Sequence, residues 1–145
     1  MNRGLKISVL LLRLALGVLY FYAGLVKVLD PKWSAAGYLK SAQTWHGFYA
    51  WLAAPANIGW VNFINEWALT LLGLALLLGL GVRLAAPLGA LLMLLFYVPI
   101  LHFPYVGTNF YLVDEHVVFI LCLSILYFTR AGEYFGLDKY IRFRR

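Results

Sequence analysis

Four long runs of apolar residues dominate this 145-residue sequence, and they constrain its fold more than any other feature. They cover residues 7–29, 61–82, 84–101 and 112–129. At about 1.5 Å of helix rise per residue, each run approaches the length needed to cross a hydrocarbon core about 30 Å thick. With 63% hydrophobic and 12% charged residues, too little polar surface remains to cover a water-soluble globule. We therefore expect an all-α integral membrane protein, a four-helix antiparallel bundle in a single domain of residues 1–145.

The basic residues are distributed unevenly between the two ends of this bundle. Eight flank one end and three the other, and the positive-inside rule places the richer end in the cytoplasm. Both termini, including the tail at 130–145, are then cytoplasmic in a cell membrane. The net charge of +6 therefore reports topology, and no nucleic-acid partner is expected. The two groups are Arg3, Lys6, Arg83, Arg130, Lys139, Arg142, Arg144 and Arg145, and Lys27, Lys32 and Lys40.

The outer loop at 30–60 is rich in aromatic residues. All five tryptophans lie between positions 33 and 67, which is typical of a membrane interface. Apolar residues recur at helical spacing here, which predicts a helix lying on the outer leaflet. An irregular loop in the aromatic belt and a lid over the bundle are the alternatives. The spaced residues are Tyr38, Ala42, Trp45, Tyr49 and Leu52.

The first apolar run carries charged and small residues along one helical face: Arg13, Gly17, Tyr20, Gly24 and Lys27. A charge at membrane depth costs about 2.5–3.5 kcal/mol on insertion scales, so this face should contact protein rather than lipid.

The second run has a similar face with Asn62, Glu66, Thr70 and Gly73. Glu66 is the acidic residue deep enough in the membrane to pair with a cation of the first helix, and Lys27 enters the membrane from the same side. We expect an ion pair between Lys27 and Glu66.

Polar residues gather at the outer end of the threaded bundle, where a quinone headgroup or a small polar substrate would arrive. Asp114 is placed either to cap the fourth helix or to serve a site, and His116 either to bond a loop carbonyl or to move a proton. The cluster comprises Lys27, Glu66, Tyr97, His102, Asn109, Asp114, Glu115 and His116, and Tyr20 and Trp67 are further candidates for substrate contact.

Metal and haem sites are not expected. Cys122 is the single cysteine, which removes internal disulfides and thiolate clusters. His102 and His116 could face a haem only across a very short turn, and the spacing of histidines and carboxylates for a metal is loose.

Small residues in the second and third runs allow close helix contact, among them Gly79, Gly81 and the pair Ala85 and Gly89. The segment 138–145 either begins a short helix capped by Asp138 or serves, as its basic residues favour, only to set the topology.

Three segments together resemble the DoxX/DoxD-like membrane protein family. They are RLALGVLYFYAGLVKV at 13–28, Glu66 followed by LLGLALLLGLGVRLAAPLGALLML at 71–94, and NFYLVDEHVVFILCLSILYF at 109–128 with AGEYFGLD after it. The motif residues are Arg13, Gly17, Gly24, Lys27, Glu66, Gly73, Gly79, Arg83, Asn109, Asp114, His116, Gly132, Gly136 and Asp138.

The resemblance implies a four-helix membrane subunit that meets quinone, because the family is named for the small membrane subunit of an archaeal thiosulfate:quinone oxidoreductase. Lys27, Glu66, Asp114 and His116 would line the headgroup site. His116 or Glu66 would exchange protons, Lys27 would stabilise a developing oxyanion, and Asp114 would orient His116. Electrons would have to come from a redox partner or an enclosed cofactor.

Two other functions remain open from the sequence. One is a non-catalytic subunit that packs into a larger membrane complex or a homo-oligomer, in which the outer polar groups would satisfy one another without a cavity. The other is a binder of a small lipid or solute. An open pocket whose ligand undergoes no redox change on binding would support this function.

Overall fold

The computed structural model describes residues 1–140, and three of its helices are long and apolar enough to cross a membrane. They are α1 (Arg3–Leu29), α4 (Ile58–Leu78) and α5 (Val82–Ile100). The fourth, α6 (Glu115–Phe128), has 14 residues and is shorter than a full span. The predicted helical membrane architecture is thus confirmed in its main elements. The predicted span 112–129 was too long, because Leu112 has a positive φ of 55° and Asp114 is extended, so the helix begins only at Glu115.

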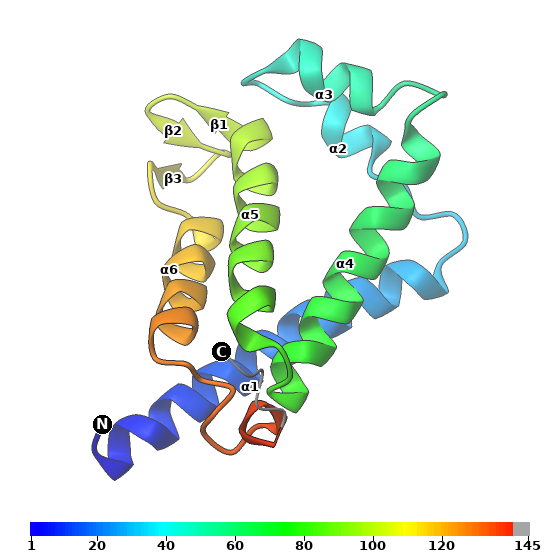
Figure 1. The fold of residues 1–145 in the computed structure, drawn as a ribbon. Coiled ribbons are helices and arrows are strands. Elements are labelled where there is room, and N and C mark those ends of the chain that lie inside the picture. Colours follow the sequence, from blue (N-terminus) through cyan, green and yellow to red (C-terminus); the bar gives the residue numbers. More distant parts are fainter. Residues whose placement is uncertain (141–145) are drawn as a thin grey trace.

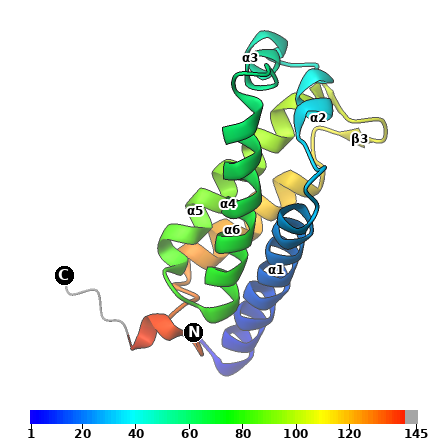
Figure 2. The same cartoon turned by 90° about the vertical axis from the view of Figure 1, so that its right-hand side faces the viewer.

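The helices pack as two pairs, α1 with α4 and α5 with α6 (Figures 1 and 2). The predicted protein-facing stripe of α1 is confirmed, since Arg13, Gly17, Tyr20 and Gly24 are buried. Close approach depends on glycine: a Cβ on Gly73 would lie 2.1 Å from the backbone nitrogen of Phe21. The first pair is therefore held backbone to backbone.

The turn between α4 and α5 falls at Gly79–Gly81 rather than near residue 83. Both glycines have positive φ, 65° at Gly79 and 62° at Gly81. They were expected to serve helix packing, but their left-handed backbone ends α4 and starts α5, a conformation that glycine adopts without steric cost. From this turn α4 and α5 diverge toward the other end of the molecule (Figure 1).

Arg13 joins α1 to the segment that follows α6. Its guanidinium is 1% exposed and donates to the carbonyl oxygens of Ala131 at 2.8 Å, Tyr134 at 3.2 Å and Phe135 at 3.3 Å. These carbonyls follow the end of α6, where backbone acceptors lack intrahelical donors. We call this end of the molecule the inner end.

Asp138 contributes to the same end. Its carboxylate accepts from the backbone N–H groups of Gly81 at 2.6 Å and Val82 at 3.1 Å, so it caps α5. The prediction that it caps its own helix was wrong, because it lies inside the 3-10 turn η1 (Leu137–Lys139). The remainder of the expected tail helix, 141–145, lies outside the described residues.

At the outer end, two short helices replace the single predicted interfacial helix. They are α2 (Ala36–Lys40) and α3 (His46–Leu52). The chain breaks between them at Trp45, which has φ 53° and is 67% exposed. We call residues 36–53 the roof; its inward face is formed by Leu39, Ala42, Tyr49 and Ala53.

A small antiparallel sheet forms the connection expected as a simple turn at 102–111. Its strands are β1 (Leu101–His102), β2 (Tyr105–Val106) and β3 (Phe110–Tyr111), in that order. The fold is therefore mostly rather than purely helical. Leu101 pairs with Val106, and Val106 pairs with Phe110.

Candidate functional site

A cavity of about 740 Å³ lies at the outer end between the two helix pairs and beneath the roof. Its size falls within the range of small-molecule sites. Helices α1, α4, α5 and α6 all contribute to its wall, with Lys27 from α1, Asn65 from α4, Phe96 from α5 and His116 from α6. Most of the lining is apolar or aromatic, and the few polar groups lie among these rings. This is the composition expected of a binding site for a largely apolar molecule.

Lys27 is the cation of this cavity, and aromatic rings surround it. Its Nζ donates to Oδ1 of Asn65 at 3.0 Å and lies 4.7 Å from the ring centroid of Trp33 and 5.5 Å from that of Phe96. Cation–π contacts and one amide oxygen hold the half-buried ammonium in place. An ammonium has three N–H donors, so Lys27 can donate to a ligand oxygen as well as to Asn65.

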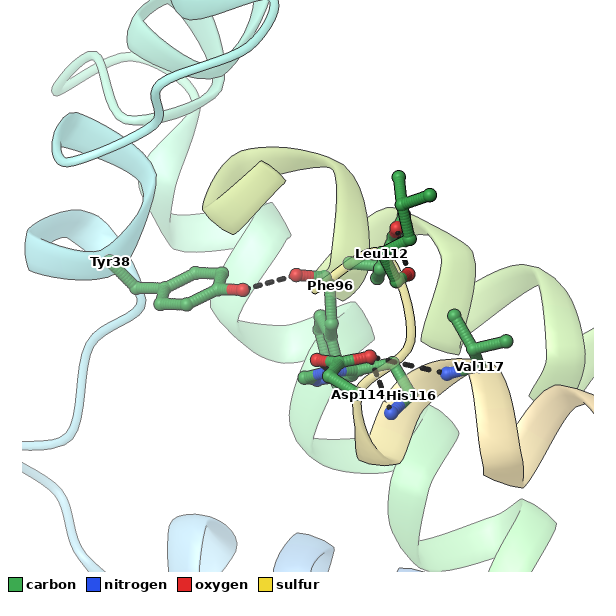
Figure 3. Close-up of polar contacts among 7 residues, drawn as sticks. Tyr38, Phe96, Leu112, Asp114, His116 and Val117 are labelled. Atoms are coloured by element: carbon green, nitrogen blue, oxygen red, sulfur yellow. Dashed lines mark hydrogen bonds and ion pairs between the residues drawn. The ribbon is translucent and has the colours of Figure 1, made fainter. Parts of the chain in front are cut away.

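His116 faces the cavity from the first turn of α6, and Asp114 holds its ring. The Nδ1 atom lies 2.6 Å from Oδ2 of Asp114 (Figure 3). Oδ1 of Asp114 also accepts from the backbone N–H groups of His116 at 3.0 Å and Val117 at 3.3 Å, which caps the helix. Asp114 thus both caps and orients. A histidine bound at Nδ1 presents Nε2 for proton exchange, the arrangement that a general acid or base requires.

Phe96 connects the two polar groups. Its ring centroid lies 6.3 Å from that of His116 in an edge-to-face arrangement, while Lys27 lies over the same ring. The Tyr38 hydroxyl donates to the Phe96 carbonyl (Figure 3). Phe96 is therefore fixed by the roof at its backbone, and its ring lies beside both the cation and the histidine.

Pro99 explains why the roof attaches to this end of α5. Proline has no N–H, so the carbonyl of Leu95 lacks its helical donor. The Tyr49 hydroxyl donates to that carbonyl at 3.1 Å. Burial raises the pKa of both Tyr38 and Tyr49, so these hydroxyls stay protonated donors. Two more roof groups bond the end of α5 and β1: the Gln43 N–H donates to the Pro99 carbonyl at 2.7 Å, and the Thr44 hydroxyl to the Leu101 carbonyl at 2.6 Å.

Of the residues predicted from sequence, Lys27, Glu115 and His116 line the cavity, and Asp114 supports His116 from behind. The predicted ion pair between Lys27 and Glu66 was wrong, since within residues 1–140 Lys27 bonds Asn65 instead. A helix turns about 100° per residue, so choosing between neighbouring positions 65 and 66 needs the exact rotation of α4 against α1.

The other candidates lie outside the lining of this cavity. Tyr20 is fully buried and its hydroxyl donates to the Gly89 carbonyl at 3.2 Å. Tyr97 donates to the Leu112 carbonyl at 2.6 Å. Trp67 lies 6.3 Å from Phe63, centroid to centroid, and is 41% exposed. His102 lines a second, smaller cavity beside the sheet, and Asn109 is exposed.

Sequence reasoning missed Asn65, Trp33 and Phe96 as neighbours of Lys27. The aromatic residues were visible as an interface belt, but their convergence on one cation depends on how the roof folds back over the bundle. In the described part of the chain, no group of three or more His, Cys, Asp or Glu side chains is placed to hold a metal ion.

Comparison with known proteins gives one match. The family model described as DoxX matches residues 8–102, a region that includes most of α1 and all of the roof, α4 and α5. No curated protein matches the chain, and no solved structure does.

Proposed function

Because the chain belongs to the DoxX family, we propose that it is a membrane subunit of a quinone-linked oxidoreductase that binds the quinone headgroup in the outer cavity. One observation carries this proposal: the Lys27 ammonium and the Asp114-bound His116 both face a single aromatic-lined cavity. In this proposal both termini lie on the cytoplasmic side of the cell membrane, as the basic residues indicate.

The lining suits a flat ring that carries oxygens at its edge. Aromatic side chains of Trp33, Tyr38 and Phe96 offer faces and edges for stacking. Lys27 offers an N–H donor, and His116 offers a ring nitrogen that either donates or accepts. A carbonyl oxygen on an apolar ring requires such a hydrogen-bond donor, and the ring itself requires aromatic surface for stacking.

The residues of the chain would divide the chemistry as follows. A bound quinone would supply two-electron redox chemistry coupled to proton uptake. Lys27 would stabilise negative charge on a ligand oxygen, which is strongest in a site that excludes water. His116 would move a proton at Nε2, and Asp114 would stabilise the protonated imidazole through Nδ1. Glu66 does not line the cavity, so in this proposal His116 rather than Glu66 exchanges the proton.

Electron transfer needs a further protein or cofactor, because none of these side chains carries electrons alone. We therefore include another membrane subunit, or a second copy of this chain, in the proposal. A subunit that only packs against a larger complex would have no need of an aromatic-lined cavity with a cation in its wall.

The test is to quantify quinone in lipid extracts of gently purified protein by mass spectrometry, together with the ultraviolet–visible spectrum. We expect near-stoichiometric quinone in wild type and in the matched control Glu66→Gln, and strongly reduced quinone in His116→Ala and Lys27→Met. Wild type without quinone would contradict the proposal. A different lipid bound in stoichiometric amount would instead favour a lipid binder.

A further inference from the structure

The outer cavity has two chemically different sides. Between α4 and α5 its lining includes Ile64 and Leu95, which are 52% and 41% exposed. Between α1 and α6 its lining includes Lys27, Glu115 and His116. An apolar side and a polar side therefore border one cavity.

The apolar side lies where α4 and α5 have diverged. The two helices meet at the Gly79–Gly81 turn and separate toward the outer end, with the roof above the gap (Figure 1). Ile64 and Leu95 belong to helices long and apolar enough to cross a membrane, so an opening of the cavity between them would face lipid. We call this side, defined by Ile64 and Leu95, the lipid mouth.

The roof covers the cavity on the remaining side. Tyr49, which lines the cavity, is 1% exposed, and Leu39 is 7% exposed. The bonds from Tyr38, Gln43, Thr44 and Tyr49 fix the roof to α5 and β1. The roof is thus tied to α5 and β1 above the cavity, whereas no such hydrogen bonds cross the lipid mouth in the described residues.

We propose that the cavity takes a membrane-dissolved amphiphile whose ring lies at Lys27 and His116 and whose hydrocarbon tail leaves through the lipid mouth past Ile64 and Leu95. This inference rests on the proposed quinone site and adds the ligand's orientation, its route and its tail. A tail that leaves through the lipid mouth stays among apolar side chains and lipid while the ring binds, so narrowing the lipid mouth should weaken tailed ligands more than bare rings.

The test compares decylubiquinone, which has a hydrocarbon tail, with duroquinone, which has none, on protein in lipid nanodiscs. Binding is followed by quenching of tryptophan fluorescence, since Trp33 and Trp60 line the cavity. Ile64→Trp and Leu95→Trp narrow the lipid mouth. Leu71→Trp is the matched control, because Leu71 is 56% exposed on α4 and outside the cavity lining.

We expect Ile64→Trp and Leu95→Trp to weaken decylubiquinone binding at least tenfold and to change duroquinone binding less than threefold. Leu71→Trp should change neither. Equal loss of both ligands, or loss of neither, would overturn the inference while leaving the quinone site standing. Failure of wild type to bind either quinone would overturn the proposed function itself.

A second measurement needs no variant. Decylubiquinone with a photoreactive diazirine at the tail end should label peptides of α4 and α5 near Ile64 and Leu95 in wild-type protein. Labelling confined to the roof or to α6 would contradict the tail's proposed direction.

Discussion

The two ends of this molecule use buried cations in opposite ways. At the inner end Arg13 donates to three backbone carbonyls and lies against Gly79 and Gly136, with no space beside it. At the outer end Lys27 has one amide partner and two rings, and it borders a cavity. A charge that donates to several backbone carbonyls stabilises the fold, whereas a charge that lines a cavity can also donate to a ligand. The comparison favours a structural role for the inner end and supports the proposed binding role of the outer end.

The largest effect should follow from breaking the inner end. Arg13→Met removes three charge-assisted hydrogen bonds to carbonyls, each worth about 1.5–3 kcal/mol, and leaves the buried Ala131 carbonyl without this donor. We expect the free energy of unfolding to fall by at least about 3 kcal/mol, which would appear as a large fall in melting temperature in detergent. The exposed Arg130→Gln is the control, and an unchanged Arg13→Met would refute a structural role for Arg13.

The two turn glycines sharpen the comparison within one loop. Both have positive φ, but a Cβ on Gly79 would lie 2.5 Å from Nη1 of Arg13, whereas a Cβ on Gly81 would meet nothing within 4 Å. Gly81→Ala should therefore lower the free energy of unfolding only by the backbone strain of a positive φ, about 1 kcal/mol. Gly79→Ala should cost clearly more, and equal melting temperatures of the two variants would count against the close packing at Arg13.

Substitution at the outer end should separate binding from stability. Lys27→Met keeps an unbranched apolar side chain of similar length but removes the ammonium, and with it the hydrogen-bond donor and the cation–π contacts. We expect quinone affinity to fall at least about tenfold, since a hydrogen bond from a charged group is worth about 1.5–3 kcal/mol, with little change in melting temperature. Isothermal titration of nanodisc-embedded protein measures this, with the exposed Lys32→Met as the control. If Lys27→Met lowered the melting temperature as much as Arg13→Met, the proposed difference in role between the two ends would be contradicted.

The smallest effect concerns how the roof is held. Tyr49→Phe leaves the Leu95 carbonyl, already without a helical donor, unpaired. We expect a local loss of about 1 kcal/mol, seen as faster hydrogen exchange across residues 36–53 with the exchange of α1 unchanged. Unaltered exchange in the roof would mean that the bond to Leu95 does not hold it.

The elements that depend on patterns within a short stretch of sequence could be predicted from the sequence. Long apolar runs identify α1, α4 and α5, and the small and polar stripe of α1 correctly indicates its buried face. Asp114 could be recognised as a cap because an acid stands just before an apolar run.

Other features depend on contacts between distant segments. Asp138 caps α5 across 57 positions of sequence, and no local pattern reveals that partner. The choice of Asn65 over Glu66 as the neighbour of Lys27 depends on helix rotation. The roof's break at Trp45 replaces a regular helical pattern with a positive-φ residue, because the chain must turn to reach the carbonyls near Pro99.

The most direct test of this account is an experimental structure of the wild-type protein in lipid nanodiscs with decylubiquinone. We predict ring density among Trp33, Phe96 and His116, with one ligand oxygen within hydrogen-bond distance of Lys27 Nζ, and tail density between α4 and α5. A structure in which α4 and α5 pack together along their whole length, with side chains filling the space beside Lys27, would contradict it.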